Sequence, residues 1–570
     1  MEKCGGEVLL DLFQNYGIEY IFCSPGSEWV PVWNGLSDRY SRGDDRLKYI
    51  NCRHEGLAVS AAIGYTKMTG KLPAVLLHAG VGTLHAAMTI RNAYSTKIPM
   101  IIFSAEDSDH GEDTAVKPMG GHWISSLADI GGPEALIRPS VKWSNAVRTK
   151  DTLIDSVYRA CHIAQTVPQG PAFIAVSREL LFKPLSKAKY APLSPLSGLP
   201  QVASSNLEEV AQRLIESKQP IIITEHAGKS PEAVKKLTEM AELLAIPVFE
   251  STDPRFGNFP RNSPMHMGFN VSGEFRDSDT VFVVGATIPW YPPASFPKDG
   301  AKVIFLDETP LKENLPFWGI QPDLLLTADI HECLTTLAGM IREKINESGR
   351  TGSNYQERFE RLRNSHNKMV EKWKNDALAE QNKKPVSPKW FFHTLNKMLP
   401  ADSVIVDETI TYGRHLKPYL LETNRFIRAV YGGLGMGFGE AAGVKIVSGD
   451  RPVVFIVGDG TFNYNPAIGG LGLCQEYNLP ILIIVLNNGG YISMSGGYHS
   501  EFPEGWAATH KKYLGVDILP RPEYSKLAEA FDAYGEKIED PGDIEPALKR
   551  AAEQLAQGKT VLLDVILERA

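Results

Sequence analysis

The stretch PVVFIVGDGTFNYNPAIGGLGLCQEYNLPILIIVLNNGGY, residues Pro452–Tyr491, decides the fold of this chain. It predicts a buried strand ending at Gly458-Asp459-Gly460, then a segment of helix length, then a second buried strand ending at Asn487-Asn488. Strands that are apolar throughout are typical of parallel sheets with helices on both faces. Ligands bind at the carboxyl ends of the strands in such sheets, and both polar clusters fall there.

Similar apolar runs recur along the chain, bounded by Gly, Pro or Asp and separated by segments of helix length. We therefore expect an α/β protein built from doubly wound parallel sheets. Besides the two strands above, examples of these runs are Ala74–Ala79, Met100–Ala105, Ala172–Val176, Pro220–Thr224, Val281–Gly285, Lys302–Asp307, Ser403–Asp407 and Thr560–Ile566.

The chain has 570 residues, which is too long for one ordinary hydrophobic core. Residues 186–206 are rich in Pro and Ser, and residues 346–388 are strongly charged, so both stretches are typical of connecting segments. We expect three α/β domains of ordinary size, at residues 1–185, 206–345 and 389–570, with a charged helical connector at 346–388.

Composition excludes several classes of function. Asp and Glu total 67 against 59 Lys and Arg, a formal charge of −8, whereas nucleic-acid binding favours a basic surface. No stretch approaches the roughly 18 apolar residues that a membrane span needs, and the N-terminus lacks a signal-peptide pattern. None of the six cysteines forms a C-x-x-C pair. We expect a cytoplasmic protein that handles small molecules.

The Gly-Asp-Gly cluster carries the chemistry of the C-terminal motif. Asp459 offers a carboxylate to a hard cation, the asparagine pair adds an amide oxygen, and a backbone carbonyl completes three ligands. The remaining octahedral positions suit a Mg²⁺ ion that also binds phosphate oxygens and water. Alone, Gly-Asp-Gly also forms ordinary turns.

Together with the asparagine pair, this motif resembles the thiamine-diphosphate signature of the acetohydroxyacid synthase, pyruvate oxidase, benzoylformate decarboxylase and 2-hydroxyacyl-CoA lyase superfamily. The resemblance implies that Asp459, Asn488 and the Gly490 carbonyl bind Mg²⁺. It places Gly458, Gly460, Thr461 and Tyr491 at the cofactor, and residues 389–570 become the diphosphate-binding domain. Asn487 is interpreted either as part of the pair or as a residue that holds the loop.

The segment AVYGGLGMGFGEAAG, Ala429–Gly443, predicts a tight turn between a strand and a helix. The same resemblance places Gly433 and Leu434 at the cofactor. Leu434 would be the bulky residue that bends the cofactor and brings its pyrimidine nitrogen near the thiazolium C2–H. Glu440 departs from the small or apolar residue that is usual in the family.

Glu55 opens an alanine-rich helix in NCRHEGLAVSAAIGYTKMTGK, Asn51–Lys71. A glutamate in the first helical turn is also favoured by the helix dipole alone. The order of glutamate, small-residue helix, G-Y-x-x-x-T-G-K, strand and glycine turn is similar to the family's pyrimidine-binding domain, here residues 1–185. That similarity implies that Glu55 bonds N1′ of the aminopyrimidine, where a carboxylate of raised pKa can share a proton.

Several side chains are candidates for contact with substrate. By the same resemblance, His78 matches the active-site histidine of benzoylformate decarboxylases and Ser27 matches a loop that binds a substrate carboxylate, with Glu28 as an alternative contact. Otherwise His78 is a core histidine at a strand end and Ser27 a helix cap. Residues 491–506 are interpreted as a mobile lid. Weaker candidates are His122 and, in this lid, His499 and Glu501.

The resemblance leaves the reaction open. The leading interpretation is a 2-oxo acid decarboxylase or a carboligase/lyase, followed by an acetolactate-synthase-like transferase, a 2-hydroxyacyl-CoA lyase, and a non-catalytic cofactor-binding subunit. The substrate would be a 2-oxo acid, an aldehyde or a 2-hydroxyacyl compound. In relatives the central domain binds FAD, ADP or nothing, and the subunits form homodimers or homotetramers.

Overall fold

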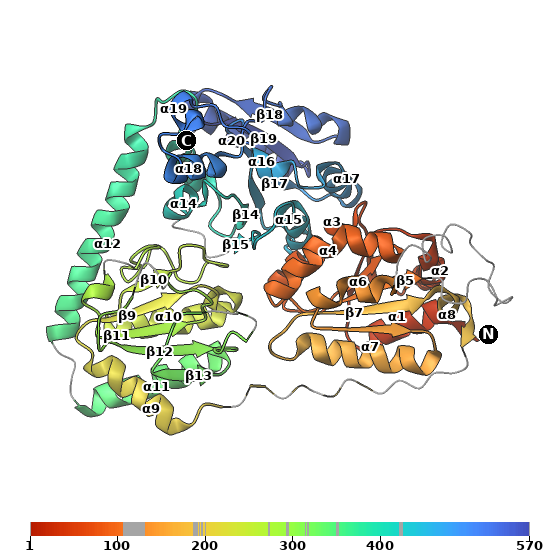
Figure 1. Cartoon of the computed structure of the whole chain (residues 1–570), viewed down its shortest axis with the longest axis horizontal. Coiled ribbons are helices and arrows are strands. Elements are labelled where there is room, and N and C mark those ends of the chain that lie inside the picture. Colours follow the sequence, from red (N-terminus) through yellow and green to blue (C-terminus); the bar gives the residue numbers. More distant parts are fainter. Residues whose placement is uncertain are drawn as a thin grey trace.

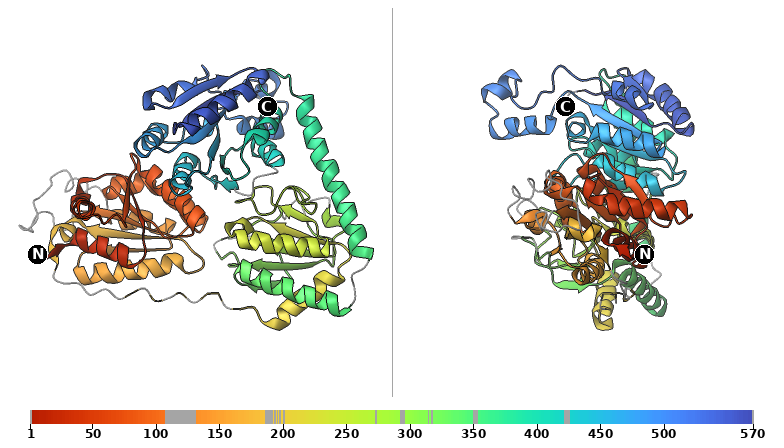
Figure 2. Two further views of the ribbon diagram at one scale, coloured as in Figure 1. Left: turned by 180° about the vertical axis from the view of Figure 1, so that it is seen from behind. Right: turned by 90° about the vertical axis from the view of Figure 1, so that its right-hand side faces the viewer.

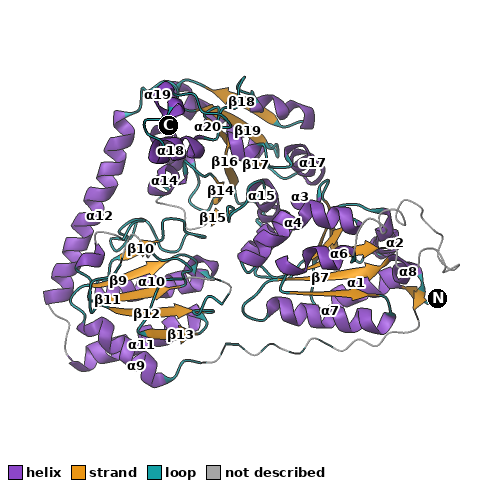
Figure 3. Cartoon of the chain, in the orientation of Figure 1, coloured by secondary structure: helices purple, strands orange, loops and turns teal. Residues whose placement is uncertain are grey.

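The computed structural model consists of three parallel sheets, each flanked by helices (Figures 1 and 3). It describes residues 2–568 except 107–130, 186–191, 193, 195, 197, 200, 272–273, 292–295, 314, 316–317, 349–352 and 421–425. We call the three bodies the first, central and third domains, in chain order. The expected α/β class with three doubly wound parallel sheets is confirmed.

The first domain contains a six-stranded sheet whose pairings are all parallel. In spatial order its strands are β3 (Lys48–Asn51), β2 (Tyr20–Cys23), β4 (Ala74–Leu77), β5 (Met100–Glu106), β7 (Pro171–Ser177) and β6 (Trp143–Val147). Its helices are α1 (Gly5–Asn15), α2 (Val30–Ser41), α3 (Glu55–Thr69), α4 (Ala79–Ser95), α6 (Gly132–Ile137), α7 (Lys150–Gln165) and α8 (Arg178–Phe182). A short antiparallel pair, β1 (Lys3–Cys4) and β8 (Pro184–Leu185), closes this domain.

The central domain has a five-stranded parallel sheet. In spatial order its strands are β10 (Val248–Glu250), β9 (Pro220–Thr224), β11 (Thr280–Val284), β12 (Lys302–Asp307) and β13 (Leu324–Thr327). Its helices are α9 (Ser204–Glu216), α10 (Pro231–Leu244) and α11 (Ile330–Ser348). The long helix α12 (Ser353–Ala379) falls within the predicted connector and runs along one side of the molecule from the central to the third domain (Figures 1 and 2).

The third domain repeats the six-stranded parallel arrangement. In spatial order its strands are β15 (Phe426–Arg428), β14 (Val404–Glu408), β16 (Val453–Gly458), β17 (Ile481–Asn487), β19 (Val561–Ile566) and β18 (Tyr534–Ile538). Its helices are α13 (Pro388–Met398), α14 (Gly413–Leu416), α15 (Gly437–Val447), α16 (Asp459–Phe462), α17 (Ala467–Tyr477), α18 (Ile492–Glu501), α19 (Trp506–His510) and α20 (Ile544–Ala556).

Each apolar run predicted from the sequence forms a strand buried on both faces. In β7, for example, all seven residues are buried, and successive side chains enter two different cores. The run that was predicted to reach Ala79 ends at Leu77, because His78 caps α4 and Ala79 is its first residue.

The first and third domains share one hydrophobic core, centred on the crossing of α3 and α15. Small residues allow this contact. A Cβ atom on Gly443 would lie 1.9 Å from the Ala61 carbonyl oxygen, and one on Gly64 would lie 2.0 Å from the Glu440 carbonyl oxygen. The small-residue pattern of both helices is therefore explained by backbones that nearly touch.

A buried ion pair at this crossing accounts for Glu440. The Lys67 ammonium lies 2.7 Å from Glu440 Oε2, and the two side chains are 4% and 0% exposed. Burial raises the pKa of Glu440, and Lys67 opposes that shift. Lys67 also donates to the carbonyl oxygen of Arg428 at 3.0 Å, so the pair ties α3 to two elements of the third domain.

We predict that Gly443→Ala destabilises the protein by about 1–3 kcal/mol, because the new methyl group collides with a backbone that cannot easily retreat. Gly339→Ala is the matched control. Gly339 also lies inside a helix, a Cβ there meets nothing within 4 Å, and the change should stabilise by about 0.5–1 kcal/mol. Urea unfolding of the two variants measures the difference, and equal effects would contradict the proposed close contact.

Candidate active site

Asp459 stands between the carboxyl end of β16 and the turn that follows β17. Its Oδ2 accepts N–H bonds from Gly489 at 2.7 Å and Gly490 at 3.2 Å, and its Oδ1 accepts one from Gly460 at 2.9 Å. The side-chain oxygen of Asn488 accepts a bond from the same Gly490 N–H at 3.0 Å. The predicted metal ligands Asp459 and Asn488 thus lie around one glycine turn.

The environment of Asp459 fits a cation. The residue is 1% exposed, and within the described ranges no lysine or arginine forms an ion pair with it. Burial raises the pKa of Asp459 to about 6. An unpaired buried carboxylate is costly unless a cation compensates it, and a carboxylate beside an amide oxygen is a donor set that Mg²⁺ accepts.

The neighbouring predicted cofactor residues surround this carboxylate. Gly458 ends β16, and Thr461 is buried in α16. Tyr491 precedes α18, and its ring occupies the space where a Cβ on Gly460 would lie, at 2.6 Å. Asn487 points elsewhere, donating to Asp564 at 2.9 Å and to the Pro522 carbonyl at 3.0 Å, so it anchors the end of β17.

The turn that carries Gly433 and Leu434 is fixed by a buried carboxyl group. Glu408 Oε1 accepts the backbone N–H groups of Gly435 at 2.8 Å and Met436 at 2.7 Å, and Oε2 accepts the Asn465 amide at 2.7 Å. Gly435 has φ +93°, a conformation that favours glycine. Leu434 itself stays half-buried, while Met436 beside it is fully buried.

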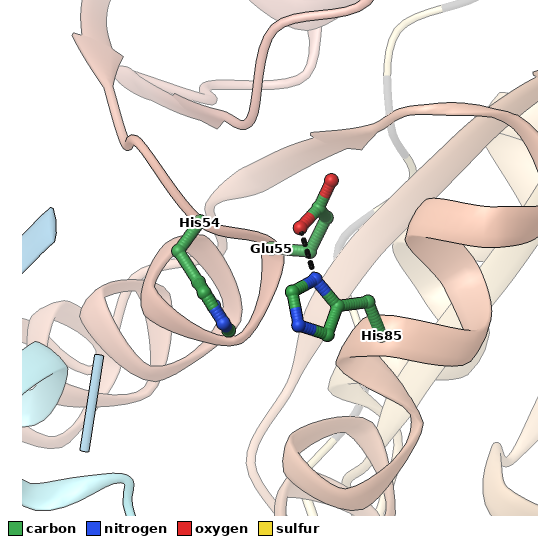
Figure 4. Close-up of side chains that lie close together, drawn as sticks. All are labelled: His54, Glu55 and His85. Atoms are coloured by element: carbon green, nitrogen blue, oxygen red, sulfur yellow. Dashed lines mark hydrogen bonds and ion pairs between the residues drawn. The ribbon is translucent and has the colours of Figure 1, made fainter.

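On the first domain, Glu55 is the first residue of α3 and pairs with a histidine from α4. His85 Nδ1 lies 2.7 Å from Glu55 Oε2, and the His54 ring lies 4.1 Å from the His85 ring (Figure 4). Ligand atoms of these three residues lie within 4.8 Å of one another, so they could also hold a metal ion. The absence of a side chain at Gly82 leaves room for Glu55, whose Cγ would be 3.2 Å from a Cβ there.

His78 and Glu28 form a second pair at the same edge of the first sheet. His78 Nδ1 lies 2.9 Å from Glu28 Oε1, which also accepts the Ala79 N–H at 3.0 Å. Glu28 is fully buried, and its hydrogen bond raises the pKa of His78. A Cβ on Gly26 would lie within 2.5 Å of both side chains, which explains the glycine before Ser27. Ser27 begins a short 3₁₀ helix, Ser27–Trp29.

The remaining candidates are more dispersed. His499 and Glu501 are exposed on α18, and His499 Nε2 contacts the Tyr513 hydroxyl at 2.8 Å. The segment interpreted as a mobile lid contains a helix, Ile492–Glu501. His122 lies outside the described residues. The Glu55 and His78 groups belong to the first domain, whereas the Asp459 group belongs to the third.

A cavity of about 480 Å³ lies between the first and central domains, where an FAD or ADP would be sought. Asp307, at the end of β12, is already bonded to Lys312 Nζ at 2.7 Å and His226 Nε2 at 3.1 Å. The nearby Gly228 is explained by packing, because a Cβ there would lie 2.3 Å from the Gly257 carbonyl oxygen. These residues give no specific support to a nucleotide.

Three family descriptions match the chain: Thiamine pyrophosphate enzyme, N-terminal TPP binding domain (residues 3–127), central domain (207–337) and C-terminal TPP binding domain (411–565). The chain therefore belongs to the thiamine-pyrophosphate-dependent enzymes, as the motifs predict. No helix among the described residues is long and apolar enough to span a membrane.

Curated relatives match nearly the full length. Acetolactate synthase large subunit of Buchnera aphidicola subsp. Schizaphis graminum is 25% identical, covering 99% of this chain and 95% of its own. Benzoylformate decarboxylase of Pseudomonas aeruginosa is 23% identical (97% and 97%), and 2-hydroxyacyl-CoA lyase 2 of Danio rerio is 22% identical (99% and 91%). The chain falls in the group that contains these enzymes.

Solved structures share the fold. Thiamine diphosphate-dependent 4-hydroxybenzoylformate decarboxylase of Rhodococcus jostii RHA1 superposes with a TM-score of 0.77 at 21% identity, covering 100% of this chain and 99% of its own.

Glu408, Asn465 and His85 were missed by the sequence analysis. Glu408 directly follows the predicted strand Ser403–Asp407, so its position at a carboxyl strand end was a usable signal. Asn465 and His85 had no such signal, because their roles depend on partners distant in sequence or on another helix.

Glu408 gives a pH-dependent prediction. Burial raises the pKa of Glu408 to about 7, so the unfolded chain releases this proton at lower pH than the folded protein does. Glu408 therefore costs stability as pH rises from about 4.5 to about 7, on the order of 3 kcal/mol in total. Glu408→Gln keeps an acceptor oxygen but cannot ionise. The free energy of unfolding of the variant, minus that of the wild type, should therefore increase from pH 5 to pH 8.

Thermal and urea unfolding at the two pH values measure this gain. Glu504→Gln, at an exposed position, is the control and should show no comparable gain. A constant difference between Glu408→Gln and wild type at both pH values would show that Glu408 does not titrate in this range.

Proposed function

We propose that this chain is a Mg²⁺-dependent enzyme that cleaves or forms a carbon–carbon bond beside a carbonyl, as a 2-oxo acid decarboxylase or carboligase/lyase. The observation that carries the proposal is the buried, unpaired Asp459 carboxylate beside the Asn488 amide oxygen. Asp459, Asn488 and the Gly490 carbonyl would hold Mg²⁺, and Gly458, Gly460, Thr461 and Tyr491 would line the diphosphate.

Thiamine diphosphate, when bound, supplies a nucleophilic carbon that adds to a carbonyl carbon. The chain's own residues do the rest. Glu55 would hold a proton at N1′ of the pyrimidine, and His85 would orient the Glu55 carboxylate through their 2.7 Å contact. Leu434, with Gly433, would support the cofactor from a turn that Glu408 fixes.

His78 is proposed to exchange protons with the substrate, and Ser27 to bind its carboxylate. Glu28 would act through His78, because its buried carboxylate is already hydrogen-bonded to the His78 ring and accepts the Ala79 N–H. His499 and Glu501 would contact substrate from α18. His122 is kept as a candidate for contact with substrate on the sequence alone. Supported by its raised pKa, His78 would stay protonated over more of the neutral range than an ordinary histidine.

A second copy of the chain is proposed to complete the site in a homodimer or homotetramer. One face of α4 exposes Val81, Leu84 and Met88 by 49%, 52% and 42%, at helical spacing. In the third domain, Tyr464 and Ile468 are 58% and 71% exposed, and Tyr464 lies against Gly435 in the turn that carries Gly433 and Leu434. Apolar clusters of this kind mark interaction surfaces.

The first test removes the acid–base group. Glu55→Gln should lower the rate of product formation by roughly 10²–10⁴-fold, the usual size for one such group. Calorimetry should still detect binding of thiamine diphosphate and Mg²⁺ to the Glu55→Gln variant. Glu19→Gln, at an exposed ion pair with Lys71, is the matched control. Wild-type activity in Glu55→Gln would contradict the role proposed for Glu55, and cofactor binding without product formation by the wild type would favour a non-catalytic, cofactor-binding subunit.

A second candidate is an acetolactate-synthase-like transferase, favoured by the full-length similarity to acetolactate synthases. Incubation with pyruvate separates the two. The leading proposal predicts aldehyde and carbon dioxide, or aldehyde ligation, from aryl or larger 2-oxo acids. Rapid formation of acetolactate would instead support the transferase and contradict the leading proposal. Activity that depends on coenzyme A would favour the 2-hydroxyacyl-CoA lyase alternative.

A further inference from the structure

A second, larger cavity of about 1020 Å³ lies beside the proposed cofactor site, between α18, the segment after β14, and the central domain. The segment after β10 contributes Thr252 and Asp253, and α18 contributes residues between Ile492 and His499. Because α18 begins directly after the Asn488–Tyr491 turn, the cavity adjoins the proposed Mg²⁺ ligands. A volume of this size holds far more than a pyruvate-sized acid, since drug-sized ligands occupy roughly 300–1,000 Å³.

The walls of this cavity carry excess positive charge. Four lining residues are cations, Arg414, Lys417, Arg428 and Lys511, and Asp253 is the one lining carboxylate. Arg428 is neutralised, because it bonds Asp253 at 2.8 Å and Asp407 on its other side. Within the described part of the chain, none of the other three cations forms an ion pair with a carboxylate.

These three cations stand at two depths. Lys417 is 6% exposed, and its ammonium group donates to the Thr252 carbonyl oxygen and faces the Phe269 ring. Burial and the nearby Arg428 lower the pKa of Lys417 to about 8. Arg414 and Lys511 are exposed, and both line the cavity. A buried ammonium without a carboxylate partner is costly, and an entering anion would relieve that cost.

We propose that this cavity binds the non-reacting end of the substrate, and that this end carries an anionic group. The proposal rests on the proposed function, because it places the reacting carbonyl at the adjacent cofactor. Arg414 and Lys511 would attract and bind the anionic end, and Lys417 would bind it where the cavity is driest. A second carboxylate on a 2-oxo acid and the phosphates of a thioester carrier share this chemistry.

Binding of matched probes tests the proposal. Calorimetry is performed with thiamine diphosphate and Mg²⁺ at saturating levels, so that their own site is filled. The probes are 2-oxoglutarate, 2-oxopentanoate, which has the same five-carbon chain without the second carboxylate, and coenzyme A. We expect 2-oxoglutarate or coenzyme A to bind at least tenfold more tightly than 2-oxopentanoate, and salt to weaken that binding.

Variants at the exposed cations assign the effect to the cavity. The double variant Arg414→Gln/Lys511→Gln should lose at least tenfold in affinity for the preferred anionic probe and leave 2-oxopentanoate unchanged. Arg414→Lys/Lys511→Arg keeps both charges and should retain most of the affinity. Lys512→Gln, which removes a neighbouring charge that does not line the cavity, is the control.

2-Oxoglutarate and coenzyme A distinguish the two possible sources of the anionic group at the non-reacting end. Preference for 2-oxoglutarate identifies a dicarboxylic 2-oxo acid, and preference for coenzyme A identifies a phosphate-bearing thioester. Equal affinity for all three probes, or full anion binding in the Gln double variant, would overturn the proposal. If thiamine diphosphate itself fails to bind, the proposed function fails, while the comparison of 2-oxoglutarate and coenzyme A with 2-oxopentanoate, whose far end is uncharged, still decides whether the cavity binds an anionic group.

Discussion

The close approach of α3 and α15 is the constraint on which the arrangement of this molecule depends. It places a helix that begins with Glu55 against a helix that follows the Leu434 turn, and it merges the cores of two domains. Glycine on either side allows backbone to meet backbone, as Gly64 and Gly443 show. Packing at that distance resists small shifts, so the first and third domains of the chain are held in a fixed relation.

Electrostatics reinforces the same crossing. The Lys67–Glu440 pair is buried among apolar side chains, where removing one partner would leave an unpaired charge, a loss of about 3–5 kcal/mol. Lys67 further bonds the Arg428 carbonyl, and the Arg428 side chain bonds Asp253 of the central domain. One series of contacts therefore links all three domains beside the cavity of about 1020 Å³. The walls that the central and third domains give to this cavity are held in a defined position.

The sequence predicted the α/β class, most buried strands and the cofactor motifs, because these depend on local patterns: apolar runs, glycine turns and polar residues at strand ends. The runs that it named do not include β3, β6 or β18, whose residues are partly exposed and lack an apolar run. They also do not include the short strands β2, β10, β13 and β15. The helix α18 was also missed, since Gly496 and Gly497 interrupt any helical pattern. Pairings such as Glu28 with His78, or Glu440 with Lys67, join residues 50 or more positions apart and leave no local signal.

Three buried carboxyl groups of the third domain differ in the groups that compensate them. Glu440 is compensated by Lys67, and Glu408 by two backbone N–H groups and the Asn465 amide, with a pKa of about 7 that keeps it partly protonated at neutral pH. Asp459 has backbone N–H partners but no paired cation, and it shares the Gly490 N–H with a second oxygen, that of Asn488. A carboxylate oxygen and an amide oxygen on one turn are ligands of the kind that Mg²⁺ accepts. Of the three, Asp459 is the one whose neighbour presents an amide oxygen rather than a donor, and this supports the proposal that Mg²⁺ and the diphosphate would bind at the ends of β16 and β17.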